Sequence, residues 1–388
     1  MFLKMLILFG FTLSLYALSA QEEIAKMQAE FEAAKSAQNL EFKNYKESLN
    51  KTFKAYKKEL AKYWKNPELS TKNEWVSYSQ DKKSRSKVDF KNDTLVVEVI
   101  AKDEKEAQKK LENRVAYAIS KNTKEVVDSD ELQRKIAILS KKSKRVINSQ
   151  MDAKPILSTL IFEKKPTEKE VQKYSKAVVR KEKIVKSDSK IASENLYKVV
   201  IQLPKNSKLK RSEVYKKEVF KNAQRFQLPV ELVFAIIQTE SNFNPFAKSH
   251  IPAFGLMQIV PHSAGRDTYR LLYKKDGIPS ATYLYNGKNN IEMGSSYLYI
   301  LYYRYLKKIK NPQSRLYCAI AAYNTGAGNI AWAFTRRTNM RRAAQKINAM
   351  NPDEVYEKLL SDLRYDEPKH YLRRVKKRMQ IYKEAYQL

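Results

Sequence analysis

The sequence predicts a mainly α-helical protein, in which a helical C-terminal domain is preceded by a small α+β domain and an N-terminal amphipathic helix. Three observations support this fold class. Glycine is absent between Gly10 and Gly255, apolar residues recur at intervals of three or four within residues 21–66, and alternating apolar residues mark short stretches of residues 67–205. Intervals of three or four are the period of a helix face, and alternation is the period of a strand face.

The N-terminus has the features of a secretory signal peptide. Lys4 precedes an apolar run that ends at Leu18, and the small residues Ser19 and Ala20 follow. The run is shorter than the ~20 apolar residues of a typical membrane-spanning helix. We therefore expect residues 1–20 to be a cleaved export signal, with an uncleaved N-terminal anchor as the alternative.

Cysteine and histidine are scarce, which excludes several kinds of site. Cys318 is the only cysteine, so no disulfide can form within the chain, and no cysteine near residue 20 could accept a lipid. The three histidines without a cysteine cluster indicate no metal site. We expect Cys318 to be a core residue, and we expect no cofactor.

The chain is strongly basic. Lysine and arginine total 75 against 42 aspartate and glutamate residues, which gives a formal charge of +33. Such a charge favours anionic partners: nucleic acid, acidic lipid headgroups of a membrane, or an anionic cell wall. The export signal and the lack of a nucleic-acid-binding motif argue against nucleic acid. A solvated charge without a dedicated partner is the alternative.

Residues 21–66 contain neither glycine nor proline. Their apolar and aromatic residues recur at intervals of three or four: Phe42, Tyr45, Leu49, Phe53, Tyr56, Leu60 and Tyr63. This pattern predicts a long amphipathic helix or a helical hairpin, which packs on the next domain and ends at Pro67.

Residues 67–205 predict an α+β accessory domain in which we find no catalytic motif. The expected elements are a strand hairpin at 88–90 and 95–100, further strands at 155–162 and 197–203, and charged helices at 103–124 and 129–149. Binding or spacing is the role that we expect for this domain.

Residues 206–388 predict a helical domain. Pro229 suits the first turn of a helix that carries Glu240 and stops at Asn244-Pro245. The other expected helices lie at 214–226, 291–310, 314–324, 329–337, 352–360 and 368–385.

The helix that carries Glu240 contains the first candidate catalytic group. Val233, Ile236 and Ile237 share one face of this helix, and Glu240 continues that face. A carboxylate among apolar neighbours loses hydration, which raises its pKa. It can then hold a proton near neutral pH and donate it to a leaving group. A glutamate at the solvent edge of an amphipathic helix is the alternative.

Four short motifs occur in order along the helical region: Glu240-Ser241, Gly255-Leu256-Met257-Gln258, Ala322-Tyr323-Asn324-Thr325-Gly326, and Glu367 to Val375. Each motif is weak evidence separately, since a Tyr-Asn-x-Gly sequence is often a helix C-cap. Together they resemble the soluble lytic transglycosylase domain, whose fold is lysozyme-like. The resemblance covers residues 206–388.

A second resemblance includes the accessory domain. Two groups of residues are similar to a membrane-bound subfamily of lytic transglycosylases: Trp75-Val76-Ser77-Tyr78 with Arg85 and residues 88–98, and Ser249-His250-Ile251-Pro252-Ala253-Phe254-Gly255 with Gly265-Arg266-Asp267. Members of that subfamily are typically lipoproteins, whereas this chain lacks the acceptor cysteine. The resemblance implies a periplasmic location, in association with the outer membrane or the cell wall.

The resemblance also implies a reaction. Family members cleave the β-1,4 bond between N-acetylmuramic acid and N-acetylglucosamine in peptidoglycan strands without water, and the product ends in 1,6-anhydro-N-acetylmuramic acid. Most glycosidases need two carboxylates, but Asp267 and Asp276 lie in polar, loop-like surroundings. In the family's scheme the substrate's own acetamido oxygen attacks C1, and Glu240 acts first as acid and then as base.

The family implies further residues around Glu240. Ser249 would orient the acetamido carbonyl, and Gln258 would offer its amide to the sugar or to Glu240. The other residues implied to bind substrate are Ser241, Gly255, Met257, Tyr323, Asn324, Glu367 and Tyr371. Plainer roles compete for several of these: a turn for Ser249, core packing for Met257, a helix cap for Asn324, and a surface ion pair with Arg374 for Glu367.

Two other functions remain compatible with these residues. A goose-type lysozyme-like hydrolase would share the fold and Glu240 but use water as acceptor, and it would need a second well-placed carboxylate. A non-catalytic cell-wall-binding protein would use its positive charge alone. The sequence does not specify an oligomeric state.

Overall fold

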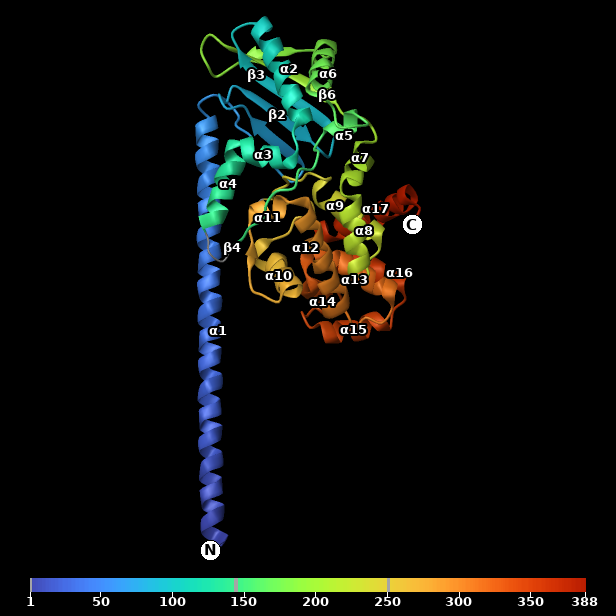
Figure 1. Ribbon diagram of the computed structural model, residues 1–388. Helices are drawn as coiled ribbons and strands as arrows, with labels where there is room; N and C mark the ends of the chain where they lie inside the picture. The colour runs from blue at the N-terminus through green and yellow to red at the C-terminus, as the bar shows by residue number, and fades with distance from the viewer. Residues whose placement is uncertain (1, 143–145, 250–251) are drawn as a thin grey trace.

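The computed structural model describes residues 2–142, 146–249 and 252–388. Met1 of the predicted signal peptide lies outside these residues, as do His250 and Ile251 of the second resemblance. Figure 1 shows three parts: a long N-terminal helix, an α+β unit, and a helical domain that contains the C-terminus. The predicted fold class, mainly helical with a preceding α+β unit, is confirmed.

The elements are as follows. The helices are α1 (Phe2–Leu60), α2 (Glu104–Ser120), α3 (Thr123–Ser129), α4 (Glu131–Lys142), α5 (Ser158–Ile161), α6 (Glu168–Lys181), α7 (Ser207–Val214), α8 (Lys216–Arg225), α9 (Val230–Ser241), α10 (Arg266–Tyr273), α11 (Ala281–Tyr285), α12 (Gly287–Tyr299), α13 (Pro312–Thr325), α14 (Ala327–Thr335), α15 (Met340–Asn348), α16 (Pro352–Asp362) and α17 (Asp366–Tyr386). Two π-helical turns are η1 (Pro261–Gly265) and η2 (Ile300–Tyr305). The strands are β1 (Glu74–Tyr78), β2 (Ser84–Asp89), β3 (Thr94–Ala101), β4 (Val146–Ile147), β5 (Val185–Asp188), β6 (Asn195–Gln202) and β7 (Ile278–Pro279).

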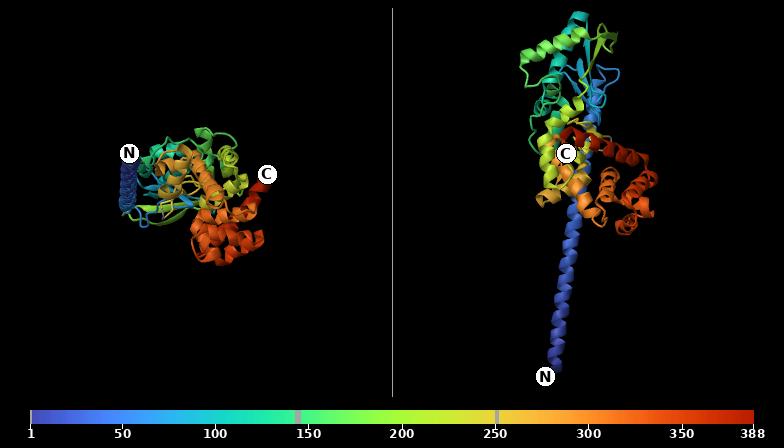
Figure 2. Two further views of the ribbon diagram at one scale, coloured as in Figure 1. Left: turned by 90° about the horizontal axis from the view of Figure 1, so that it is seen from below. Right: turned by 90° about the vertical axis from the view of Figure 1, so that its right-hand side faces the viewer.

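The N-terminal segment forms one helix, α1, rather than a hairpin. Only its C-terminal part lies against the rest of the molecule, and its N-terminal part projects away (Figures 1 and 2). The predicted stripe is buried where α1 packs on α4, and the Tyr45 hydroxyl there bonds with Ser140 Oγ at 3.0 Å. No helix among the described residues is both long enough and apolar enough to cross a membrane.

The end of α1 differs from the prediction. The helix stops at Leu60, not at Pro67, because the chain turns to bury Trp64. The Trp64 indole donates to the Lys82 carbonyl at 2.7 Å and packs edge-on against Tyr78. The tertiary contacts of one tryptophan therefore outweigh the helical propensity of the residues before the proline.

The α+β unit is built on a five-stranded antiparallel sheet in the order β1-β2-β3-β6-β5. The predicted hairpin is confirmed as β2 and β3, in which Ser84 lies opposite Val99 and Asp89 opposite Thr94. Helices α2 and α6 pack together and cover one face of the sheet (Figure 1). The predicted strand at 197–203 is confirmed as β6, whereas β5 and α6 had no sequence prediction.

Residues 155–162 do not form the predicted strand. They contain the single-turn helix α5, with Ile156, Leu157 and Leu160 all buried. A helical turn places residues three and four apart on one side, whereas a strand would separate Ile156 and Leu157. The predicted helix at 129–149 also ends early, at Lys142, and its last residues instead pair as β4 with β7 in parallel.

The helical domain surrounds α9, which is buried from Leu232 to Ser241 and packs against α8 and α17. Helix α9 ends where Asn242 adopts a left-handed conformation with φ of 51°, before the predicted stop at Asn244-Pro245. The predicted helix at 214–226 is confirmed as α8, with α7 before it unpredicted, and the predicted helix at 291–310 ends as η2. Helices α10, α11 and α15 had no sequence prediction.

The two domains meet at the C-terminal end of α9. We name the segment Ser70–Trp75, which precedes and enters β1, the docking segment. Its Asn73 side chain accepts from the Asn242 amide at 3.0 Å, and its Thr71 carbonyl accepts from the Lys248 backbone at 3.3 Å. The Trp75 ring packs 5.9 Å from the ring of Phe246. Polar and apolar contacts thus hold the accessory unit on the helix that carries Glu240.

Lys248 provides a pH-dependent test of this packing. Its Nζ lies 3.1 Å from the centroid of the Phe53 ring of α1, and burial lowers the pKa of Lys248 from 10.5 to about 8. Below that pH the folded protein holds a partly desolvated charge. We predict that Lys248→Met raises the free energy of unfolding at pH 7 by on the order of 1–2 kcal/mol.

Because the folded state lowers the pKa of Lys248, the stability gain of Lys248→Met should depend on pH in a defined range. The lysine is charged in both the folded and unfolded states below about pH 8 and neutral in both above 10.5, so the advantage of the variant should shrink between these values. Denaturant titrations across this range measure it, with the exposed Lys91→Met as control for general charge repulsion. A Lys248→Met protein that is less stable than wild type at pH 7 would contradict the argument.

Candidate active site

Glu240 lies in the last turn of α9 with only 8% of its side chain exposed. The helix around it is apolar and buried on every side, so the carboxylate needs a partner to offset the loss of hydration. That partner is Lys72 of the docking segment, whose Nζ lies 3.0 Å from Glu240 Oε2. The accessory unit thus supplies a charged group to the candidate catalytic residue of the helical domain.

Two tyrosines lie in the electrostatic field of Glu240. Tyr371 of α17 is fully buried, and its hydroxyl lies beside Glu240 without forming a well-aligned hydrogen bond. Tyr323 of α13 donates its hydroxyl to the Met257 carbonyl at 2.9 Å. Burial, and then the negative charge of Glu240, raise the pKa of each tyrosine well above its usual value. Both phenols therefore stay protonated and can act as hydrogen-bond donors.

The segment Phe254–Gln258 forms a tight loop beside α9. Gly255 has φ of 76°, and a Cβ atom there would lie 2.1 Å from the Leu284 carbonyl oxygen, so this position requires glycine. The Ser241 hydroxyl donates to the Leu256 carbonyl at 2.8 Å and ties the loop to the end of α9. The structure therefore brings Ser241 and Gly255 together as structural supports of the loop.

Asn290 of α12 fixes the same loop from the other side. It is fully buried, accepts from the Met257 backbone at 2.7 Å, and donates to the carbonyls of Phe254 and Leu284, both at 2.8 Å. Sequence analysis missed both Asn290 and Lys72. An asparagine within a helix and one lysine among many carry no local signal, and each reaches the site only through the fold.

Gln258 and Ser249 are positioned differently from the prediction. The Gln258 amide donates to the carbonyls of Ala247 and Gly255, at 3.1 and 2.9 Å, rather than towards Glu240. The Ser249 hydroxyl accepts from the Ala253 backbone at 3.3 Å, as in a turn. In this structure both side chains bond to the backbone of the loop region, and their predicted substrate contacts remain predictions.

The remaining predicted residues differ in exposure. Met257 is fully buried against Gly294 of α12, which agrees with a packing role. Asn324 is half-buried at the end of α13, just before Gly326, which has φ of 83°. Glu367 is exposed in the first turn of α17 and pairs with Arg374 at 2.9 Å, the surface arrangement weighed above.

Of the two other carboxylates weighed from the sequence, Asp276 has partners of its own. The guanidinium of Arg266, and with it that of Arg270, holds the pKa of Asp276 well below its usual range. Asp267 is half-exposed. The pKa of Tyr305 is raised first by the burial of its own side chain and then by the negative charge of Asp267. Among the described residues, no second carboxylate is recorded in contact with Glu240.

No group of three or more histidine, cysteine, aspartate or glutamate side chains suited to a metal occurs in the described part of the chain. Cys318 is fully buried in α13, as expected of a core residue. The chemistry available at the site is therefore that of one buried carboxylate, one ammonium group and two protonated phenols.

Comparisons with known proteins confirm the resemblance. Residues 217–347 match the transglycosylase SLT domain family. The membrane-bound lytic murein transglycosylase C of Sodalis glossinidius is 45% identical over 180 residues, which are 46% of this chain and 50% of that protein. The namesake from Haemophilus influenzae is 44% identical over 167 residues, 43% of this chain and 46% of its own. The chain spans about half the length of the curated relatives it matches.

Solved structures give a weaker likeness. The 70-kDa soluble lytic transglycosylase of Escherichia coli is 24% identical, with a TM-score of 0.34, over 44% of this chain and 24% of that one. The lytic transglycosylase Slt of Pseudomonas aeruginosa is 24% identical, with a TM-score of 0.35, over 45% of this chain and 24% of its own.

The bonding of Asn290 predicts a specific loss of stability. Asn290→Ala removes three hydrogen bonds and takes the side-chain partner from the buried N–H of Met257 and from the Leu284 carbonyl, while the Phe254 carbonyl keeps its bond from the Ile259 backbone. It should therefore lower the free energy of unfolding by roughly 2–4 kcal/mol. Denaturant unfolding measures this. The neighbouring Asn289→Ala, which loses contacts at a half-exposed site, is the control and should have a smaller effect. Equal losses in both variants would contradict the role assigned to Asn290.

Proposed function

We propose that the helical domain, residues 206–388, is a peptidoglycan lytic transglycosylase. It would cleave the β-1,4 bond between N-acetylmuramic acid and N-acetylglucosamine without water and leave a 1,6-anhydro-N-acetylmuramic acid end. The observation that carries this proposal is a single buried carboxylate, Glu240, held at the end of an apolar helix beside two protonated tyrosines. The match of residues 217–347 to the transglycosylase SLT domain supports it.

In the proposed mechanism Glu240 performs two proton transfers. It first donates a proton to the glycosidic oxygen, and that oxygen leaves with N-acetylglucosamine while the acetamido oxygen of the muramic sugar bonds to C1. The resulting carboxylate then takes the proton of the C6 hydroxyl. The C6 oxygen attacks C1, the acetamido oxygen is released, and the anhydro ring closes. The glutamate ends protonated, as it began, and no water is consumed.

The tyrosines would hold the reacting carboxylate. Tyr371 has a buried hydroxyl beside Glu240 without a well-aligned hydrogen bond, so it can donate to Glu240 or to the sugar once substrate reorders the site. The hydroxyl of Tyr323 is held in one orientation by its hydrogen bond to the Met257 carbonyl, so its dipole near Glu240 keeps a fixed direction. We propose Ser249, Gln258, Asn324 and Glu367 as substrate-binding residues on the family resemblance alone.

Lys72 must give up its contact before catalysis. The Lys72 ammonium group lies 3.0 Å from Glu240 Oε2, and the first step requires a proton on that carboxylate, which must then face the glycosidic oxygen. We infer that an entering glycan strand separates the two groups. Lys72 is 35% exposed, so its side chain has solvent into which to move.

Three other functions are less well supported. A lysozyme-like hydrolase needs a second carboxylate near the reacting carbon, and Asp276, one of the two weighed from the sequence, is instead paired with Arg266 and Arg270. A non-catalytic wall-binding protein gives no reason to bury a glutamate and two tyrosines together. A nucleic-acid-binding role rests on charge alone.

We propose an exported, periplasmic location in contact with the wall or the outer membrane. The relatives carry "membrane-bound" in their names, and the charge of +33 favours attraction to anionic polymers and lipid headgroups.

The assignment of Glu240 predicts the effect of one substitution. Glu240→Gln keeps the size of the side chain but removes its proton transfer, so release of muropeptides from purified peptidoglycan should fall by at least about 10²-fold. Mass spectrometry of the released sugars measures turnover, and thermal unfolding checks the fold. Asp267→Asn is the matched control and should retain activity. Cleavage by Glu240→Gln at a near-wild-type rate would overturn the assignment.

The ion pair predicts non-additive stabilities. Lys72→Met leaves the carboxylate of Glu240 buried without its partner and should lower the free energy of unfolding by about 1–2 kcal/mol, a value reduced for the partial exposure of Lys72. Lys72→Met combined with Glu240→Gln should recover most of that loss, because neither charge is then unpaired. Denaturant unfolding of the four proteins measures the coupling. Strictly additive effects would show that the pair does not form in solution.

A further inference from the structure

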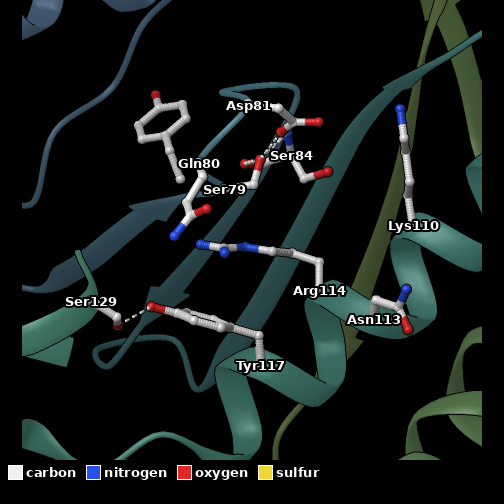
Figure 3. Close-up of a pocket in the computed structure, with 10 residues that line it drawn as sticks. Ser79, Gln80, Asp81, Ser84, Lys110, Asn113, Arg114, Tyr117 and Ser129 are labelled. Carbon is white, nitrogen blue, oxygen red and sulfur yellow. Dashed lines mark hydrogen bonds between the residues drawn. The ribbon is translucent and has the colours of Figure 1, made fainter. Parts of the chain in front are cut away.

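A pocket of about 500 Å³ lies within the α+β unit, apart from the residues around Glu240. It is formed by the end of β1, the turn between β1 and β2, helix α2 and the end of α3 (Figure 3). Its lining is rich in hydroxyl and amide groups: Ser79, Ser84 and Ser129, with Gln80, Asn113 and Tyr117. Pockets of this size commonly bind small molecules.

The pocket contains a buried and unpaired cation. Arg114 is 5% exposed, and its guanidinium lies over the Tyr117 ring, 4.3 Å from the ring centroid. Its Nε and Nη2 atoms are sealed from solvent and have no hydrogen-bond partner among the described residues. Nη1 is not sealed in this way, and Figure 3 shows the guanidinium extending towards Gln80. A buried charge without a partner is strongly unfavourable, so an anion that reached this guanidinium would be stabilised by it.

The two carboxylates nearest to Arg114 already accept hydrogen bonds from other groups. Asp130 and Asp81 act on Arg114 through space, but neither forms an ion pair with it. Asp130 accepts from Ser77 Oγ at 3.1 Å and Gln133 N at 3.0 Å, and Asp81 accepts from Ser79 Oγ at 2.5 Å and Lys83 N at 3.1 Å.

Lys110, the second cation that lines the pocket, already has partners. Lys110 bonds to the carboxylate of Glu106 at 2.8 Å and to the Ile100 carbonyl at 2.9 Å. Arg114 is therefore the cation of the pocket lining that has no anionic partner.

The other buried arginines show what such a group binds in this protein. Four arginines are buried in the described part of the chain: Arg85, Arg114, Arg211 and Arg266. All of them except Arg114 form an ion pair with a carboxylate. Arg266 gives the geometry, since its Nε and Nη2 bind the two oxygens of Asp276 at 2.9 and 2.7 Å. The same two atoms of Arg114 have no hydrogen-bond partner among the described residues.

We propose that this pocket binds the carboxylate of an amino acid or short peptide, with Arg114 as its anchor. A single uncommitted cation beside the negative Asp81 suits a monoanion better than a doubly charged phosphate group. A carboxylate entering the pocket meets Nη1 first, and a small rotation of the guanidinium offers it a second donor. The side chains of Gln80 and Asn113 match the amide groups of a peptide backbone. The inference does not depend on the proposed activity of Glu240.

Calorimetric titration of the full chain tests the proposal. The probes are D-alanyl-D-alanine and L-alanyl-L-alanine, which separate wall-type peptides from ordinary ones, and the amide of each dipeptide, which lacks only the carboxylate. We expect at least one dipeptide to bind, and its amide to bind at least about tenfold more weakly. Inorganic phosphate that binds more tightly than both dipeptides would overturn the carboxylate assignment, and so would equal binding of acid and amide or no binding at all.

Variants then assign the binding to Arg114. Arg114→Gln should abolish dipeptide binding, and Arg114→Lys, which keeps the charge but not the planar fork, should weaken it. Lys110→Gln is the matched control on the same pocket and should bind as wild type. Because an unpaired buried charge is removed, ligand-free Arg114→Gln should unfold at the same or a higher temperature than wild type. A marked loss of thermal stability in Arg114→Gln would indicate a structural role and contradict the proposal, and unchanged binding would do so as well.

Discussion

The burial of one negative charge at the end of an apolar helix is the constraint around which the two domains are arranged. Helix α9 is covered on all sides by its neighbours, yet its last turn holds Glu240. Desolvating a carboxylate is costly unless a positive group meets it. The group that does so, Lys72, lies outside the helical domain, in the docking segment of the α+β unit. The accessory unit is therefore part of the electrostatic environment of the proposed catalytic residue.

Around this charge the helical domain holds its other groups rigidly. The loop Phe254–Gln258 is tied to α9 by Ser241 and to α12 by Asn290, and it can pass between them because Gly255 carries no side chain. The same loop accepts the hydroxyl of Tyr323 through the Met257 carbonyl. The loop thus connects the carboxylate, one phenol and the core of the domain. Several of the residues that define the motif contact this backbone.

Local patterns predicted the parts of the fold that depend on local physics. The apolar face that leads to Glu240, the hairpin of β2 and β3, and the stripe of α1 are periodic in sequence, and all three occur in the structure. The errors have long-range causes. Trp64 ends α1 early by burying its ring, and residues 155–162 form a helical turn because Ile156, Leu157 and Leu160 are buried together.

The residues of the site also divide into those that local sequence patterns predict and those that only the folded structure reveals. Glu240 could be selected from its helix face, and the family resemblance placed the tyrosines near it. Lys72 precedes Glu240 by 168 residues, and Asn290 looks like any polar residue of a helix. Neither can be found from spacing, because their roles exist only once the docking segment and α12 have packed. Gln258 was predicted to offer its amide to the sugar or to Glu240; in this structure the amide donates to the carbonyls of Ala247 and Gly255, and the prediction stays open.

The central claim is that Glu240 alone transfers the protons and that the C6 hydroxyl of the substrate, not water, attacks C1. It can be tested by digesting purified peptidoglycan in water enriched in heavy oxygen. The mass of the released muropeptides then reports what reacted with C1. The account predicts fragments that carry no heavy oxygen and are lighter by one water than the products of a hydrolase. Fragments that incorporate one heavy oxygen atom at the new end would contradict it and would require a second catalytic carboxylate beside Glu240.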